Sequence, residues 1–268
     1  ENGNSKQIKM KNSFAQIYND SLQKPEEFWK DISEDVFWFK KPTRILNKSN
    51  PPFYKWFEDG VTNTCYNALD LHIDQGRGDK TALIYDSPIT GNKAKFSFNE
   101  LKEKVSKFAG ALDNQGVKKG DRVIIYMPMI PEAVIAMLAC GRIGAIHSVV
   151  FGGFASNELA SRIDDSKAKV LITASCGFEP GRTVEYRPLV DEALKLANHK
   201  VEKVILFQRK DHEVKLNEPL EISWEECLAN AKNKDCVEMG SNELAYILYT
   251  SGTTGVPKGI VRDIGGHI

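Results

Sequence analysis

The sequence predicts an α/β protein with a mostly parallel sheet flanked by helices. From about residue 67 onward, short apolar runs of strand length alternate with longer stretches whose apolar residues recur at helical spacing. The last apolar run leads into a loop rich in glycine and hydroxyl groups, and ligands of open α/β sheets bind at such strand ends. An aromatic section precedes this pattern, so the chain has at least two kinds of segment.

Residues 1–12 are polar and lacking in periodicity, which predicts a disordered tail. Residues 13–66 form the aromatic section, in which Pro25 predicts the first position of a helix. Acidic residues cancel the charge of its lysines, so packing onto a larger body is favoured over stacking on nucleic acid. Residues 67–268 form the predicted α/β domain.

The clearest helix of that domain begins at a capping box of Ser97 and Glu100 and carries an apolar stripe that ends near Gly116. Residues 131–143 are apolar on every face, which predicts a buried helix. Further helices are predicted over 158–162 and 188–197, and Ser223 is predicted to cap a short one. Strands are predicted over residues 81–85, 94–98, 123–126, 145–151, 169–173, 203–207 and from 243 onward.

Charge and cysteine content exclude several classes of function. The chain has 36 lysines and arginines against 36 aspartates and glutamates, so nothing general favours nucleic acid or an anionic membrane as a partner. Its longest apolar candidate, residues 134–150, is broken by polar residues and glycines, so we expect no membrane insertion. The five cysteines form no Cys-x-x-Cys pair, which argues against a disulfide framework or structural zinc and favours a reducing compartment.

Residues 249–259 combine hydroxyl side chains, glycines and Lys258 in a pattern that a packed core does not need. Glycines let successive backbone N–H groups point at an anion, and the lysine adds a positive charge. A solvated hairpin turn is the simplest alternative, but it needs only one or two glycines. A Walker loop would place Ser or Thr and a helix after the lysine, whereas here Gly259 and the β-prone Ile260 follow. We therefore predict a phosphate-binding loop.

The loop resembles the signature loop of the acyl-adenylate-forming enzymes, a superfamily that includes acyl-CoA synthetases, peptide-synthetase adenylation domains and luciferases. Residues 126–154 look like the same region of short-chain acyl-CoA synthetases of the acetyl-CoA and propionyl-CoA type, and the resemblance covers residues 14–268. It implies the N-terminal portion of the large adenylate-forming domain. Peptide-synthetase adenylation domains share the loop but lack the regions around Gly152 and Arg182.

The resemblance implies an ATP site in which backbone N–H groups and hydroxyls hold the β and γ phosphates and Mg²⁺ bridges their oxygens. Lys258 is the implied catalytic residue, since it would neutralise the departing pyrophosphate. No metal ligand among the side chains is predicted. The implied phosphate-binding residues are Thr250, Ser251, Gly252, Thr253, Thr254, Gly255 and Lys258.

The resemblance also implies a coenzyme A site. Gly152 and Gly153 follow a predicted strand, and glycine suits a wall that a thin ligand passes closely; in the subfamily they lie by the channel of the pantetheine arm. Arg182 offers paired donors to a phosphate. In the subfamily its turn, here Glu179, Pro180, Gly181 and Arg182, grips the 3′-phosphate, usually with two arginines. Glu179 stands where the other arginine would be, a departure typical of the propionate-type branch.

Two histidines are weighed against catalytic roles. His147 lies in an apolar strand, where a core histidine with satisfied hydrogen bonds is favoured over a catalytic base. His267 is expected to be structural.

The implied reaction converts ATP, propionate or acetate, and coenzyme A into acyl-CoA, AMP and diphosphate through an acyl-adenylate. Both half-reactions need charge stabilisation more than acid–base residues. In the family the adenine pocket, the acyl pocket and the adenylation lysine come later, so these 268 residues alone are expected to be inactive. The alternative is a truncated, non-catalytic module that binds ATP or coenzyme A. The resemblance implies the mitochondrial matrix, with the cytoplasm as the alternative.

Overall fold

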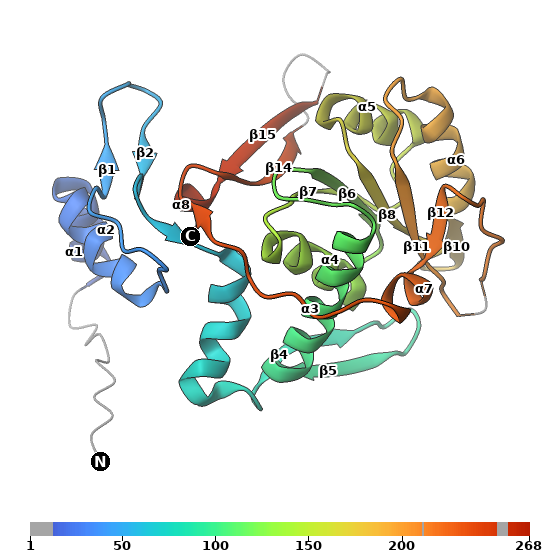
Figure 1. Ribbon diagram of the computed structural model, residues 1–268, viewed down its shortest axis with the longest axis horizontal. Coiled ribbons are helices and arrows are strands. Elements are labelled where there is room, and N and C mark those ends of the chain that lie inside the picture. Colours follow the sequence, from blue (N-terminus) through green and yellow to red (C-terminus); the bar gives the residue numbers. More distant parts are fainter. Residues whose placement is uncertain (1–12, 211, 251–256) are drawn as a thin grey trace.

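The computed structural model describes residues 13–210, 212–250 and 257–268, and a seven-stranded sheet lies at its centre (Figure 1). All neighbouring strands of this sheet are parallel except β14 and β15, which form an antiparallel hairpin. The predicted, mostly parallel sheet is therefore confirmed. Its strands in spatial order are β12 (Glu221–Ser223), β11 (Lys203–Phe207), β8 (Val170–Ala174), β6 (Arg122–Met127), β7 (Ile146–Phe151), β14 (Leu244–Thr250) and β15 (Lys258–Asp263).

Helices connect the parallel strands. The chain steps from β6 to β7 in one direction along the sheet and from β7 back past β6 to β8 in the other. Because such crossovers are right-handed, the connecting helices α4 and α5 lie on opposite faces. The helices around the sheet are α3 (Phe98–Asn114), α4 (Pro131–Arg142), α5 (Ser156–Ser166), α6 (Tyr186–Leu196), α7 (Trp224–Ala229) and the short α8 (Ile264–His267).

Local signals account for several helix ends. The capping box forms as predicted, since Ser97 accepts a hydrogen bond from the Glu100 N–H and the Glu100 carboxylate accepts one from the Ser97 N–H. Ser223 Oγ likewise accepts from the Glu226 N–H at 3.1 Å. The predicted start of α6 at Pro188 is wrong by two residues, because the helix begins at Tyr186. Proline is tolerated there since N–H groups of a first helical turn have no partner within the helix.

Smaller elements surround the main sheet. The aromatic section contains the helices α1 (Phe14–Gln23) and α2 (Pro25–Ile32), the latter with the predicted proline at its first position. Trp38 is buried there, whereas Phe14 and Phe53 are exposed, so the section packs inward through only some of its aromatic rings. The remaining elements are η1 (Ser33–Asp35), β1 (Leu46–Asn47) paired with β2 (Lys55–Trp56), β3 (Val61–Thr62) paired with β13 (Met239–Gly240), η2 (Tyr66–Asp70), η3 (Ile73–Arg77), β4 (Thr81–Asp86) paired with β5 (Lys93–Ser97), and β9 (Cys176–Glu179) paired with β10 (Arg182–Glu185).

None of the helices in the described part of the chain has both the length and the apolar character that crossing a bilayer requires.

An extended segment, residues 231–238, runs from α7 across α3 and α4 towards β13, and we call it the strap (Figure 1). The Lys234 N–H donates to Ser106 O at 3.1 Å, and Ser106 Oγ donates to Lys234 O at 2.7 Å. Further along the strap, the Val237 N–H donates to Arg142 O at 2.9 Å. The strap therefore obtains its backbone hydrogen bonds from two helices rather than from a sheet.

A buried ion pair lies beneath the strap. Arg142 is 1% exposed and donates to both oxygens of Asp70, at 2.7 and 3.1 Å. Lys102 lies 3.0 Å from the same carboxylate. Burial opposes ionisation of Asp70, but the hydrogen bonds and charge of Arg142 outweigh it and hold the pKa of Asp70 below its ordinary value. Asp70 therefore stays charged and fixes η2 against the end of α4.

Replacing Gly110 with alanine should lower the free energy of unfolding by about 1–3 kcal/mol, the usual range for overpacking. The reason is that a Cβ on this α3 glycine would overlap Lys232 O of the strap. Urea denaturation followed by circular dichroism measures the change. Gly141→Ala is the matched control, because its nearest neighbour would be the Thr64 hydroxyl at 3.1 Å. Equal losses in the two variants would show that the strap contact is not the cause.

Candidate functional site

A cavity of about 320 Å³ lies at the carboxyl ends of β6, β7 and the β9–β10 hairpin. This is the edge at which the strand order reverses, with β7 and β8 on either side of β6. Open α/β sheets bind ligands at such a point because the connecting loops diverge there. The cavity is lined in part by Met127, Phe151, Gly152, Gly177, Glu179, Val184, Tyr186 and Arg209.

Gly152 lines this cavity, and Gly153 follows it in the chain. A Cβ on Gly152 would overlap the Tyr186 hydroxyl and lie 2.7 Å from Met127 O, so only glycine fits. Gly153 has a φ of +93° and donates its N–H to the Tyr126 hydroxyl at 3.2 Å. Tyr126 in turn donates to Phe154 O at 2.8 Å. The two glycines are thus fixed by buried tyrosines.

The predicted turn at Glu179, Pro180, Gly181 and Arg182 is the tip of the β9–β10 hairpin. Gly181, which follows Pro180, has a φ of +75°. Proline followed by glycine is the pair favoured by a turn whose third residue is left-handed. Arg182 pairs with the Glu179 carboxylate at 2.6 Å, and its side chain is 70% exposed. A Cβ on Gly153 would lie 3.9 Å from that carboxylate. Of these predicted residues, Gly152 and Glu179 line the cavity, whereas Gly153, Pro180, Gly181 and Arg182 are their neighbours in the chain and do not.

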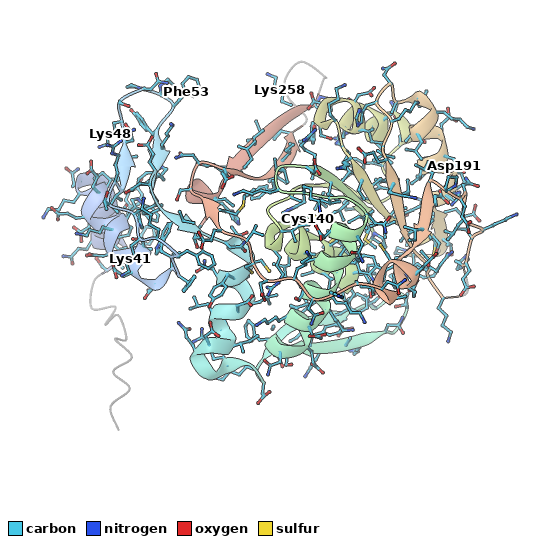
Figure 2. All side chains as sticks on the ribbon, viewed as in Figure 1. Lys41, Lys48, Phe53, Cys140, Asp191 and Lys258 are labelled. Atoms are coloured by element: carbon cyan, nitrogen blue, oxygen red, sulfur yellow. The ribbon has the colours of Figure 1, made fainter. Side chains whose placement is uncertain are left out.

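The predicted phosphate loop connects β14 to β15. Thr250, the last residue of β14, pairs with Lys258, the first residue of β15, and both side chains are exposed. Lys258 lies at the end of this hairpin (Figure 2). The predicted loop residues Ser251, Gly252, Thr253, Thr254 and Gly255 lie outside the described residues. A strand follows the loop where a Walker loop would have a helix, in agreement with the sequence.

Contacts with α5 fix the end of β14. The Tyr249 hydroxyl donates to Asp165 at 2.7 Å, and the Arg162 guanidinium lies 5.2 Å from the centre of the Tyr249 ring. Because β14 is parallel to β7, Thr250 and Gly152 lie at the same edge of the sheet. Thr250 and Lys258 do not line the cavity, however. The two predicted sets of site residues therefore share an edge but form two places on it.

Sequence reasoning missed Tyr186 and Arg209, which line the cavity, and Tyr126, which packs against Tyr186 beside it. Tyr126 and Tyr186 face each other with ring centres 5.0 Å apart, and burial raises the pKa of Tyr126 to about 12. Arg209 is 8% exposed, and its guanidinium lies 4.8 Å from the centre of the Phe178 ring. The available signal was position, because Arg209 lies two residues past the end of the predicted strand 203–207 at the carboxyl edge.

Arg187, a second cation five residues after Arg182, does not belong to this site. It pairs with Glu221 at 2.7 Å and Asp191 at 3.2 Å, so its charge holds α6 to β12. It lies outside the cavity.

His147 departs from its expectation in one respect. Among the described residues its Nδ1 has no hydrogen-bond partner, so the prediction of a fully satisfied core histidine is wrong. Its ring stacks on Tyr246, and burial lowers the pKa of His147 to about 4. A neutral imidazole in that position is consistent with a role in core packing. His267 Nδ1 lies 3.1 Å from the same tyrosine's hydroxyl.

The Gly177→Ala change should destabilise the protein through one neighbour, because the atoms nearest to its added Cβ all belong to Tyr186, the closest being the hydroxyl at 2.6 Å. In a Tyr186→Phe background the loss should shrink, with a coupling free energy of about 0.5–3 kcal/mol, the range for residues in contact. Denaturation of the two single variants and the double variant gives the cycle. Strictly additive losses would contradict this packing.

Comparison with known proteins identifies the family. The model of the AMP-binding enzyme family matches residues 72–267, and that of the acetyl-coenzyme A synthetase N-terminus matches residues 14–68. A mitochondrial acyl-CoA synthetase short-chain family member 3 from Rattus norvegicus is 54% identical over 248 residues, which are 92% of this chain and 36% of that protein. Acetyl-coenzyme A synthetase from Streptomyces avermitilis is 43% identical over 258 residues, or 96% of this chain and 39% of that protein.

A solved structure agrees with these matches. Acetoacetyl-CoA synthetase from Streptomyces lividans superimposes with a TM-score of 0.85 at 28% identity, over 95% of this chain and 39% of that one. The chain thus spans 36 to 39% of the length of these relatives. The family match covers most of the chain and includes the sheet, the cavity and the β14–β15 hairpin, and we conclude that the chain belongs to the AMP-binding enzyme family.

Proposed function

We propose that the protein carrying this chain is an acid–thiol ligase that joins propionate or acetate to coenzyme A, with ATP converted to AMP and diphosphate. The observation that carries the proposal is the shared edge, where the glycine wall after β7 and the hairpin of β14 and β15 follow adjacent parallel strands. With a phosphate site and a thiol channel at one edge of the sheet, an acyl group activated by ATP would also be within reach of the coenzyme A thiol. Relatives named as acyl-CoA and acetyl-coenzyme A synthetases support this assignment.

The first half-reaction needs a place for negative charge. The carboxylate oxygen attacks the α-phosphorus of ATP, and the bond to the bridging oxygen of pyrophosphate breaks. Lys258, exposed opposite Thr250, is free to approach the departing pyrophosphate from the hairpin end. The hydroxyl of Thr250 and those of Ser251, Thr253 and Thr254, with the loop N–H groups, are the proposed phosphate donors. Mg²⁺ bound to phosphate oxygens would supply further neutralisation, and hydroxyl oxygens suit such a hard cation.

The second half-reaction needs a path for a thiol. The thiol sulfur of coenzyme A attacks the acyl carbon and loses its proton to solvent, and AMP leaves with the bonding electrons of the mixed anhydride. We assign Gly152 and Gly153 to the wall along which the pantetheine arm passes, because Gly152 lines the cavity and Tyr186 and Met127 leave no room for a side chain there. Arg182 is assigned to the 3′-phosphate. Its exposed pair with Glu179 is of the kind that contributes little to stability, so a phosphate can replace the carboxylate.

Arg209 extends this assignment. Its guanidinium is largely buried, lines the same cavity and stacks on Phe178. A desolvated arginine favours a phosphate partner more strongly than an exposed one does. In the hairpin, Glu179 stands where the subfamily usually has a second arginine. We propose that Arg209 supplies that second cation instead.

Domain organisation and location belong to the same proposal. Residues 13–66 would form the N-terminal section and residues 67–268 the AMP-binding domain, with residues 1–12 as a tail. The mitochondrial location in the names of several relatives supports the matrix as the place of action.

In the full-length protein, Lys258→Ala should slow ATP–pyrophosphate exchange by roughly ten-fold to a thousand-fold, the range for losing one preorganised charge contact. The exchange is measured with propionate and with acetate, and thioester formation is followed in the same samples. Lys48→Ala is the control, because that lysine lies on the separate β1–β2 hairpin (Figure 2). Unchanged exchange in Lys258→Ala would remove the lysine from the mechanism, and no thioester from either acid in the unmodified protein would refute the function.

Arg182→Ala should raise the KM for coenzyme A by about three- to ten-fold, in keeping with one exposed charge-assisted contact. The KM for dephospho-coenzyme A, which lacks the 3′-phosphate, should stay unchanged in the same variant. Glu179→Gln should lower the KM for coenzyme A alone, because it releases the arginine from its carboxylate partner. Equal effects on both coenzymes would show that the hairpin does not read the 3′-phosphate.

A further inference from the structure

Two cysteines far apart in the sequence meet beneath the strap. The sulfurs of Cys65 and Cys236 and a carboxylate oxygen of Asp70 all lie within 4.8 Å of one another. Cys65 is fully buried at the start of η2, whereas Cys236 belongs to the strap and is partly exposed. The proposed ligase chemistry uses neither residue.

The surroundings of this thiol pair favour a negatively charged sulfur. Arg142 Nη1 lies 3.6 Å from Cys65 Sγ. A hydrogen bond from Cys236, then the charge of Arg142, lower the pKa of Cys65 although burial opposes the shift. Cys140 in α4 is a contrast, since burial alone raises its pKa to about 12 (Figure 2). The Cys236 thiol also donates to Asp70 Oδ2 at 3.7 Å, so the pair combines one sulfur whose ionisation Arg142 favours with a second thiol beside it.

The same cluster could be taken for a metal site, since it offers two sulfurs and a carboxylate. Both oxygens of Asp70 already bond to cations, one to Arg142 at 2.7 Å and the other to Lys102 at 3.0 Å as well as to Arg142. A divalent cation would have to displace these partners while standing beside a buried guanidinium. The arrangement therefore favours chemistry between the two sulfurs.

We propose that Cys65 and Cys236 form a reversible intrachain disulfide when a hydroperoxide reaches the pair from the partly exposed Cys236 side. The Cys65 thiolate attacks the terminal peroxide oxygen, the O–O bond breaks, and the leaving oxygen takes up a proton to become water or an alcohol. Cys65 is then a sulfenic acid. The Cys236 sulfur attacks it, the S–S bond forms, and the Cys236 proton leaves with the hydroxyl group as water. Two thiols are oxidised and one peroxide is reduced.

The bond would tie the strap to η2. A disulfide is about 2 Å long, so the sulfurs need to approach by no more than roughly 3 Å from their separation in the structure. The strap leads into β13 and then into β14, which forms the hairpin that carries Lys258. Local opening of the strap therefore takes place in the chain segment just before that hairpin. Oxidation should therefore restrain a segment that is otherwise held by hydrogen bonds to α3 and α4.

The test treats the full-length protein with hydrogen peroxide, blocks the remaining thiols with an alkylating agent and maps the peptides by mass spectrometry. We expect one linked pair of peptides that joins Cys65 to Cys236, lighter by two hydrogens and separated again by dithiothreitol. Cys236→Ser should abolish it, whereas Cys227→Ser, a change at another buried cysteine, should keep it. Amide exchange in the strap should slow by about ten-fold on oxidation, as restrained local opening predicts.

Other outcomes overturn the proposal. A disulfide between two molecules, a sulfinic acid at either cysteine without a linked peptide, or an unchanged alkylation pattern would each exclude the intrachain bond. Stoichiometric protection of both thiols by zinc in the absence of peroxide, with no linked peptide in its presence, would assign the cluster to a metal. If Cys236→Ser fails to fold, the peptide map of the unmodified protein decides by itself. Because no readout is enzymatic activity, failure here leaves the proposed function untouched.

Discussion

The buried guanidinium of Arg142 is the interaction on which the surrounding structure depends. It bonds to both oxygens of Asp70, and its Nε donates to Lys234 O of the strap at 2.5 Å. A charged group with 1% exposure would be very costly without these partners. Asn63 adds to the same junction, since its side-chain amide donates to Gly141 O and to Val237 O, both at 2.9 Å. The end of α4, the start of η2 and the strap are therefore fixed together.

The elements fixed at this junction lead to the carboxyl edge of the sheet, where both proposed substrate sites lie. α4 connects β6 to β7, so a fixed α4 holds the two strands whose carboxyl ends border the cavity. The strap continues into β13 and β14, and β14 carries the hairpin with Lys258. The buried charge of Arg142 thus fixes elements that lead to both proposed substrate sites, although it contacts neither site. The strap has few backbone hydrogen bonds of its own. Of the elements at this junction, it is therefore the one whose local opening a covalent bond would change most.

Charge at the cavity is arranged differently from charge at the junction. Arg142 is bound on several sides and has no spare capacity for a ligand, whereas Arg182 pairs with Glu179 at an exposed hairpin tip. Exposed pairs exchange partners at little free-energy cost. Arg209 lies between these cases, largely buried but facing the cavity and the Phe178 ring. Arg182 and Arg209 therefore stay available to the proposed phosphate partners, whereas the hydrogen bonds of Arg142 are all made within the fold.

The sequence by itself determined the features that depend on neighbouring residues. The capping box at Ser97, the buried helix α4 and the strand before the phosphate loop all follow from local spacing, and the structure confirms them. Gly181 also has a local cause, because the turn after Pro180 needs a positive φ. The resemblance of the loop placed the chain in its family for the same reason, since a loop that binds phosphate through its backbone needs a fixed run of residue types.

Only the tertiary structure decided which distant residues meet. The order of the strands put β7 beside β14 and so brought Gly152 and Thr250 to one edge, which no local pattern encodes. Arg209 and Tyr186 reach the cavity because separate strands end there, and Arg187 is diverted into ion pairs with Glu221 and Asp191. Cys65 and Cys236 looked unrelated in the sequence and lie together under the strap. Such contacts arise from packing and charge pairing across the whole chain, so their partners became visible only when the chain was folded.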